Sequence, residues 1–400
     1  MKNKAKNILK SSKILYSLFE DIYYYIRGLY FAFFTFIFSI FKIDRNKMMV
    51  VSYYGKGFGD NGKYIINEIL NKNNKNIKIF WALKNLNDNS LPDDVIPVKF
   101  NSIKFLYHLT TAKIWLNNTR FLNGIRKRKK QIYIQIWHGN LALKKIEFDS
   151  TLPKNYTRIM KEDNKKIDLM ISNSKFCTDM YRNSFKYNGE ICEFGTPRND
   201  VFINNSDIKL AQKKVFQEYK IPNNSKILLY APTFRDNYSK NPYNIDFNSI
   251  IKSLEEKTKN KWIIIVRFHP LVINGERFIK YEKYINATHY PDMQELINAC
   301  DLLITDYSST MFDSMIASKP VVLYANDIEK YKDERGYYFD LEKLPFPLAQ
   351  NNHELTKVFN NMELKQIVKG YNKFKDSLKL VEDGNASKKV AEKIEKLMRE

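Results

Sequence analysis

Short apolar runs alternate with amphipathic stretches along the chain from about residue 48 onward. Most of these runs are continuous rather than alternating with polar positions, which is typical of strands buried on both faces of a parallel sheet. The intervening stretches have the spacing of helices with one apolar face. We therefore expect strands at 48–54, 77–83, 95–100, 112–117, 132–137, 168–172 and 191–194, and then at 227–231, 262–268, 301–305 and 321–325.

A polar, helix-like stretch at 207–219 separates the two series of strands. Alternating strands and helices of this kind predict two α/β, Rossmann-like, doubly wound domains that face each other across a cleft. We place the first domain at 48–210 and the second at 211–400, with the last helices of the chain in the second. Ligands of such sheets bind beyond the carboxyl ends of the strands, so the residues that follow each strand are the candidates for function.

The segment 1–47 is basic, and its residues 29–41 are almost wholly apolar and aromatic. A membrane-spanning helix needs about 20 apolar residues, and Glu20, Asp21 and Arg27 interrupt this run too early. One interpretation is a core helix of the first domain. We favour a helical segment that associates with the membrane surface, with aromatic rings in the lipid interface and lysines on anionic headgroups.

The 400 residues include 66 Lys and Arg against 44 Asp and Glu, a formal net charge of +22. A balance this basic favours a polyanionic partner: nucleic acid, an anionic membrane surface or a phosphate-rich substrate. The basic run 126–130 is either a solvated loop or a contact to one of these polyanionic partners.

The cysteines are too few and too widely spaced for a disulfide framework or a zinc site; they are Cys177, Cys192 and Cys300.

Two of the five histidines directly follow expected strands. His138 stands at the end of the strand at 132–137, and Gly139 after it allows a substrate to approach the backbone. Histidine is the side chain best suited to accept a proton near pH 7. Arg267 and His269 point to the same side of an extended segment, which is an arrangement suited to phosphate.

The segment Gly57-Phe58-Gly59-Asp60-Asn61-Gly62 matches a dinucleotide-binding pattern. A single match of this kind is weak, and the carboxylate of Asp60 would repel a pyrophosphate. We therefore interpret the segment as a glycine-rich turn that lets the backbone approach something in the cleft.

Three further strand ends carry polar groups. Arg198 follows a fixed Gly-Thr-Pro turn and is either a phosphate ligand or an ordinary surface arginine. Thr233 comes directly after Pro232 at an abrupt strand end. Ser308 and Ser309 open a helix whose N-terminal N–H groups can bind phosphate, and Asp313 lies one turn further on. No Asp-x-Asp pair occupies a convincing position, so we expect no metal.

Five motifs follow one another along the chain: Trp137-His138-Gly139, Gly195-Thr196-Pro197-Arg198-Asn199-Asp200, Ala231-Pro232-Thr233-Phe234-Arg235, Arg267-Phe268-His269-Pro270 and Asp306-Tyr307-Ser308-Ser309. In this order they resemble the CDP-glycerol:glycerophosphate glycerophosphotransferase family, which comprises teichoic-acid primases, polymerases and capsule-synthesis relatives. The resemblance extends from about Gly55 to about Pro347 and includes the segment 331–337.

The resemblance implies the two-domain glycosyltransferase-B fold and transfer of a polyol phosphate, most simply glycerol phosphate, from a CDP-activated donor to an acceptor hydroxyl, with release of CMP. It implies no cofactor. It also implies a peripheral place on the cytoplasmic face of the cell membrane, where a lipid-linked or glycan acceptor of teichoic-acid or capsule synthesis lies. His138 is the expected base, and His269 is expected to stabilise the donor phosphates or the leaving CMP. The residues expected to bind the donor are Gly139, Arg198, Pro232, Thr233, Arg267, Ser308, Ser309 and Asp313.

One departure concerns the loop after Gly139. Many family members read Thr-Pro-Leu-Lys there, whereas this chain reads Asn-Leu-Ala-Leu-Lys-Lys at 140–145. The polyol therefore stays open between glycerol and ribitol, and a nucleotide-sugar glycosyltransferase of the same fold is an alternative.

A third hypothesis is a basic, non-enzymatic membrane- or nucleic-acid-binding protein. The chain has no stacking-aromatic motif of the RNA-binding kind, so we expect no nucleic-acid partner.

Overall fold

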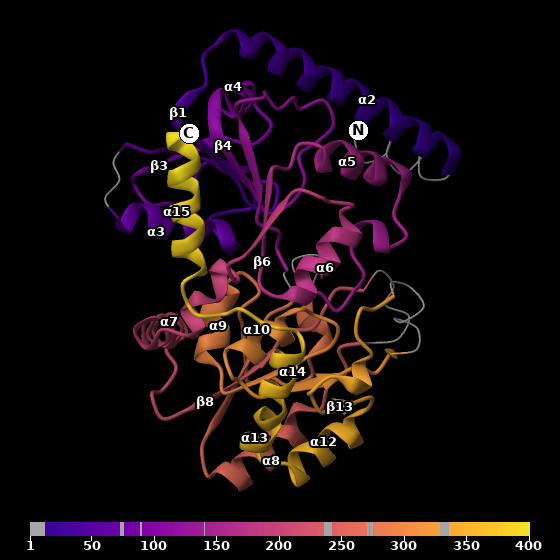
Figure 1. Cartoon of the computed structure of the whole chain (residues 1–400). Coiled ribbons are helices and arrows are strands. Elements are labelled where there is room, and N and C mark those ends of the chain that lie inside the picture. The colour runs from indigo at the N-terminus through magenta and orange to yellow at the C-terminus, as the bar shows by residue number, and fades with distance from the viewer. Residues whose placement is uncertain are drawn as a thin grey trace.

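The computed structural model describes residues 13–400 except 73–75, 89, 140, 236–241, 270–271, 273–274 and 329–335, with side chains from residue 19 onward. Two parallel sheets form the centres of the upper and lower halves of the molecule in Figure 1. This confirms the predicted α/β class with parallel sheets. The Asn140 position of the unusual loop and the family-like segment at 331–335 lie outside the described residues.

The first sheet has the strand order β3-β2-β1-β4-β5-β6-β7, and all of its neighbouring strands are parallel. The order reverses between β1 and β4, so the chain leaves these two neighbours in opposite directions along the sheet. Doubly wound sheets bind their ligands at such a point. The strands are β1 (Asp44–Val51), β2 (Lys78–Leu83), β3 (Val95–Lys99), β4 (Ala112–Asn117), β5 (Ile132–Gln135), β6 (Leu169–Ser172) and β7 (Glu190–Glu193).

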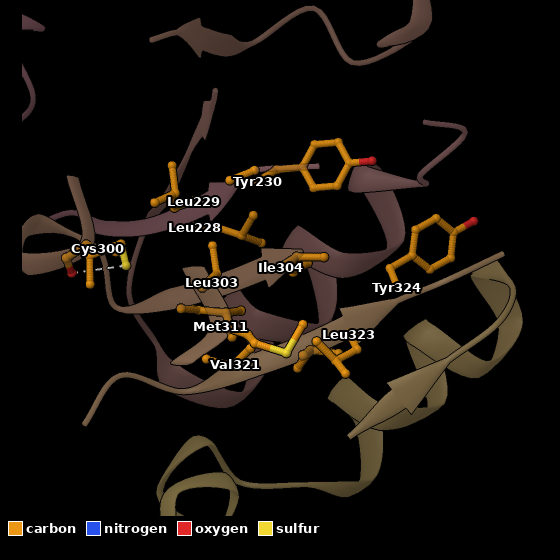
Figure 2. Close-up of a cluster of buried hydrophobic side chains, with 14 of the residues drawn as sticks. Leu228, Leu229, Tyr230, Cys300, Leu303, Ile304, Met311, Val321, Leu323 and Tyr324 are labelled. Atoms are coloured by element: carbon orange, nitrogen blue, oxygen red, sulfur yellow. Dashed lines mark hydrogen bonds between the residues drawn. The ribbon is translucent and has the colours of Figure 1, made fainter. Parts of the chain in front are cut away.

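The second sheet has the order β10-β9-β8-β11-β12-β13, again parallel throughout, and reverses between β8 and β11. Leucine, isoleucine and valine side chains of β8, β11 and β12 pack into one core, which Met311 joins from a neighbouring helix (Figure 2). The strands are β8 (Lys226–Tyr230), β9 (Trp262–Val266), β10 (Tyr284–Asn286), β11 (Leu302–Thr305), β12 (Val321–Tyr324) and β13 (Leu348–Ala349). The edge strands β10 and β13 were not predicted, because three and two residues carry too little pattern.

Helices connect the strands and cover the sheets. Several begin at a Ser, Asn or Asp whose side chain accepts a hydrogen bond from a backbone N–H of the first turn, as at Ser102 and Ser174. They are α2 (Lys13–Ile37), α3 (Asp60–Asn71), α4 (Ile103–Thr111), α5 (Lys154–Asn164), α6 (Lys175–Ser184), α7 (Asn205–Glu218), α8 (Phe247–Thr258), α9 (Met293–Ala299), α10 (Thr310–Ile316), α12 (Asn352–Asn361), α13 (Leu364–Ile367), α14 (Tyr371–Ser377) and α15 (Ala386–Arg399). The 3-10 helices are η1 (Phe38–Ile40), η2 (Glu147–Asp149), η3 (Pro197–Phe202), η4 (Gly275–Phe278), η5 (Leu341–Lys343) and η6 (Val368–Gly370).

The last helix departs from the sequence prediction. We expected the C-terminal helices in the second domain, but α15 returns to the first sheet and lies beside α3 (Figure 1). Its apolar stripe of Val390, Ala391 and Ile394 is fully buried, and the helix lies against β1 and β4. The stripe indicates only that the helix buries one face; which sheet receives that face depends on the path of the connecting segment.

Helix α2 runs along the outer edge of the first domain (Figure 1). Phe31 and Thr35 are buried, and α4 lies against it. Its other side exposes a continuous apolar and aromatic face, so the core-helix interpretation accounts for only part of the helix. None of the helices in the described part of the chain is long and apolar enough to cross a membrane. The exposed residues of this face are Phe19, Ile22, Tyr23, Tyr25, Ile26, Leu29, Tyr30, Phe33 and Phe36.

Candidate active site

The candidate residues of both sheets follow the carboxyl ends of strands. His138 comes after β5 and Arg198 after β7, whereas Arg267 comes directly after β9. The two groups of loops face each other: a Cβ atom added to Gly139 would lie 3.9 Å from the Oγ of Ser309. Residues that the sequence analysis selected from separate motifs are therefore neighbours across the junction of the two sheets.

Arg198 is buried and joins the two halves of the protein. Its Nη1 donates to the carboxylate of Asp60 at 2.7 Å and to the carbonyl oxygen of His138 at 2.8 Å. Its Nη2 donates to Asp313, on α10 of the second half, at 2.9 Å. These two carboxylates hold the pKa of the guanidinium well above its ordinary value despite its burial. Both terminal nitrogens are thus used within the protein, and the geometry favours a structural role over the predicted role in donor binding.

The glycine-rich segment before α3 also binds protein rather than a dinucleotide. The Nδ2 of Asn61 donates to the carbonyl oxygens of Ile136 at 2.9 Å and Trp137 at 2.8 Å. Its Oδ1 accepts from the backbone N–H of Arg198 at 3.1 Å. Asp60 and Asn61 therefore fix the two loops that carry His138 and Arg198, a role that sequence reasoning missed.

The contacts of His138 define its tautomer. Its Nδ1 lies 2.7 Å from the carbonyl oxygen of Asn118, which can only accept, so Nδ1 carries the hydrogen and Nε2 keeps its lone pair. Burial lowers the pKa of the imidazole, and Arg198 acts in the same direction. The Asn118 carbonyl, Asp60 and Glu147 oppose this shift without reversing it. A neutral imidazole with a free Nε2 is the form that a general base requires.

A second buried cation supports the loop beneath His138. Arg120 pairs with Glu147 and with Asp163, and its guanidinium lies 5.5 Å from the centre of the Trp137 ring. Trp137 itself has a φ of 30°, outside the usual range for a bulky residue. Nothing in the sequence around Arg120 pointed to this network, because its partners lie further along the chain, on η2 and α5.

Arg267 differs from Arg198 because one of its guanidinium nitrogens is not engaged by the described residues. Its Nη1 is buried and has no hydrogen-bond partner among the described residues. Burial lowers the pKa of this guanidinium, although Asp292 acts to raise it. A buried donor of this kind calls for a ligand that the protein itself does not provide.

Positive charges of both halves surround His269. Burial lowers the pKa of the imidazole, and the charges of Lys144 and Lys56 lower it further. Both lysines belong to the first half of the chain, whereas His269 follows β9 of the second. Together with Arg267 they make this part of the junction between the halves suited to a phosphate-bearing substrate.

The other predicted donor-binding residues occupy the point where the strand order of the second sheet reverses. The backbone N–H of Thr233, next to buried Pro232, donates to Asp306 at 2.9 Å. Ser308 accepts from the hydroxyl of Thr310 at 2.9 Å. Ser309 makes no side-chain capping bond at the start of α10. Their contacts with a donor stay a prediction.

Within the described residues, no three His, Cys, Asp or Glu side chains lie together in a way that could hold a metal ion. The sequence-based expectation of a metal-free site is not tested by this observation and stays a prediction.

Comparisons with known proteins point to one family. The family model for CDP-glycerol:poly(glycerophosphate) glycerophosphotransferase matches residues 32–396. The chain is similar to a teichoic acid poly(glycerol phosphate) polymerase of Bacillus spizizenii, with 32% identity over 92% of this chain and 97% of the relative. It is 30% identical to a teichoic acid glycerol-phosphate transferase of Staphylococcus aureus, over 90% of this chain and 96% of that protein. A solved structure of the wall teichoic acid polymerase TagF, soaked with CDPG, superposes with a TM-score of 0.81 at 28% identity, covering 95% of this chain and 98% of that one.

Loss of the Arg198 guanidinium should destabilise the fold. Arg198→Ala leaves the buried carboxylates of Asp60 and Asp313 without their cation, and we expect a loss of about 3–5 kcal/mol in the free energy of unfolding. Lys175→Ala, which breaks an exposed pair with Asp179, should cost at most about 1 kcal/mol. Denaturant titration of both variants measures the difference. Equal, small losses in the two variants would contradict this structural role of Arg198.

Glu382 should make stability depend on pH. Its carboxylate accepts from the backbone N–H of Thr196 at 3.0 Å and from Asn173 at 2.9 Å. Burial nevertheless raises its pKa from 4.5 to about 7. The folded state therefore binds this proton more tightly than the unfolded state, and the stability gained below pH 4.5 is lost as the pH rises through about 7.

The test compares Glu382→Gln with the wild type by denaturant titration from pH 4.5 to 8. We expect the wild type to lose stability relative to Glu382→Gln as the pH rises. Glu256→Gln, at an exposed position on α8, is the control and should follow the wild type. Parallel curves for all three proteins would show that Glu382 titrates normally.

Proposed function

Because the chain belongs to the CDP-glycerol:poly(glycerophosphate) glycerophosphotransferase family, we propose that it transfers glycerol phosphate from CDP-glycerol to a hydroxyl group of a teichoic-acid acceptor and releases CMP. The observation that carries this proposal is that one suitable group from each half lies close to Tyr53. His138 offers an unprotonated Nε2 from the first half, and Arg267 offers a buried donor from the second.

The proposed reaction is a single displacement at phosphorus. Nε2 of His138 takes the proton of the acceptor hydroxyl, whose oxygen attacks the phosphorus atom that carries the glycerol. A phosphodiester bond forms, the bond from that phosphorus to the bridging oxygen breaks, and CMP leaves with the electron pair. Such a reaction depends on positioning and on neutralisation of charge rather than on covalent catalysis.

In the proposal, the cations Arg267, Lys56 and Lys144 neutralise the charge of the phosphates, with the imidazole of His269 beside them. Arg267 and His269 lie on the half that is expected to hold the donor, while Lys56 and Lys144 approach from the acceptor half. Cations fixed before the reaction stabilise negative charge as it moves from the transferred phosphoryl group to CMP. This division places the CDP moiety on the second sheet and the acceptor on the first, as in a glycosyltransferase-B arrangement.

We further propose that α2 holds the enzyme on the cytoplasmic face of the cell membrane, where a lipid-linked acceptor is within reach. The exposed face of this helix carries large rings such as Phe33 and Phe36 at 58% and 63% exposure. An apolar helical face of this size is unusual on a soluble surface, and aromatic side chains favour the lipid interface. The basic residues around it, including Arg126 over the Phe36 ring, suit anionic headgroups.

The donor and the base are tested together. With membranes or a solubilised lipid-linked acceptor, we expect acceptor-dependent CMP release from CDP-glycerol and little from CDP-ribitol. His138→Asn keeps a donor for the Asn118 carbonyl but loses the base, and its rate should fall about 10²–10⁴-fold. His353→Asn, at an exposed position on α12, is the control and should keep the wild-type rate.

The outcomes separate the parts of this proposal. Near-normal turnover by folded His138→Asn would overturn the assignment of the base. Faster release from CDP-ribitol would overturn the choice of polyol, and release from neither donor by folded protein would contradict the function.

Membrane association has its own test. The wild type should sediment with vesicles that contain anionic phospholipid, and less so as salt screens the basic residues. The double variant Phe33→Glu/Phe36→Glu puts charge on the apolar face, and we expect at least a tenfold weaker association. Leu86→Glu, an exposed apolar position in the loop after β2, serves as the matched control. Equal binding of all three proteins would assign association to another surface.

A further inference from the structure

Two consecutive tyrosines leave β1 in an unfavourable backbone conformation. Tyr53 has a φ of 42° and Tyr54 a φ of 57°, and Gly55 follows at 82°. Only glycine adopts this left-handed region without penalty, and bulky residues are rare there. Such strain persists only where the surroundings enforce it, and it concentrates at functional sites.

Asn118 enforces the conformation of Tyr53. Its Oδ1 accepts from the backbone N–H of Tyr53 at 2.9 Å. Asn118 follows β4, the neighbour of β1 at the point where the strand order of the first sheet reverses. The same residue offers its carbonyl oxygen to Nδ1 of His138 at 2.7 Å. One asparagine therefore fixes both the strained tyrosine and the proposed base.

The side chain of Tyr53 lies against the imidazole. The centres of the two rings are 5.5 Å apart, and their planes are inclined by 56°. The hydroxyl is within hydrogen-bonding reach of Asp60, the carboxylate that binds Arg198. Although its hydroxyl is directed inward, Tyr53 keeps 38% of its surface exposed. The ring thus covers one side of His138, while part of the residue remains accessible from outside.

Tyr53 also faces the donor half. It is close enough to Arg267 for the two groups to interact electrostatically. The tyrosine therefore lies between the proposed base and the guanidinium proposed for the donor phosphates. In the proposed reaction, the acceptor hydroxyl and the transferred phosphoryl group must meet in this space.

We propose that Tyr53 is the residue that positions the acceptor: its ring holds the His138 imidazole in place and packs against the C–H groups of the polyol or sugar that bears the attacking hydroxyl. This inference rests on the function proposed above. Aromatic rings pack well against such aliphatic surfaces, and an exposed ring beside the base gives the incoming chain an orientation as well as a contact.

The pH–rate profile provides a test specific to this role, because it reports the pKa of the His138 imidazole. When the Tyr53 ring is removed, water reaches the imidazole and the burial that lowers its pKa is reduced. The base is then protonated at higher pH, so the acidic limb of the pH–rate profile should move to higher pH. The groups that face this imidazole are the Asn118 carbonyl, Asp60, Arg198, Glu147 and Tyr53.

Three substitutions separate the ring, the hydroxyl and the backbone. Tyr53→Ala should lower kcat/KM for the acceptor at least tenfold, with the KM for CDP-glycerol within about twofold of the wild type. Tyr53→Phe keeps the ring and should retain most of the activity and the wild-type pH profile. Tyr53→Gly should be as slow as Tyr53→Ala but melt at a higher temperature, because glycine tolerates the left-handed conformation.

The matched control is Tyr284→Ala on the edge strand β10, which should leave the acceptor kinetics unchanged. Wild-type acceptor kinetics in Tyr53→Ala, or a loss that appears only in the KM for the donor, would overturn the inference. So would an unshifted pH profile in Tyr53→Ala. A wild-type protein that releases no CMP would instead contradict the proposed function, so the two failures are distinguishable.

Discussion

The buried guanidinium of Arg198 is the contact on which the arrangement of the site depends. It binds one carboxylate from each half of the chain, Asp60 and Asp313, and it also holds the carbonyl oxygen of His138. Transfer of these charges from water is costly, and only good geometry with further hydrogen bonds offsets that cost. Asn118 and Asn199 supply such bonds to the two carboxylates. One ion cluster thus ties both halves of the chain to the loop that carries the base.

This cluster changes the interpretation of the other positive groups. In the sequence, Arg198 and Arg267 are both arginines that follow strands. In the structure, both terminal nitrogens of Arg198 bind carboxylates of the protein, whereas Nη1 of Arg267 has no partner among the described residues and is available to a ligand. Lys56 and Lys144 of the first half lie near the imidazole of His269, two positions after Arg267. The carboxylates of Asp60 and Asp313 are engaged by Arg198. Positive charge around His269 therefore depends on the arrangement of side chains as well as on the net charge of the chain.

The sequence predicted the buried strands well, because each contributes three or more apolar residues to a sheet covered on both faces. It predicted which residues follow those strands, and hence the candidate site. It failed where the outcome depends on distant contacts. The apolar stripe of α15 does not specify which sheet receives it, and Asp60 appeared only as a residue that would repel phosphate. The partner that explains it, Arg198, is 138 positions away in the chain.

The left-handed conformation of Tyr53 was the least predictable feature, since the residue type argues against it and only Gly55 hints at a tight turn. Its origin lies in the order of the strands. The strands β1 and β4 are neighbours, and the chain leaves them in opposite directions along the sheet. The residues after these strands, Tyr53 and Asn118, therefore meet beside His138. A side chain held in this way needs no reorganisation when the substrate arrives. Phosphoryl transfer gains most from groups that are already in place, so a strained but fixed ring beside the base is better suited to this reaction than a relaxed and mobile one.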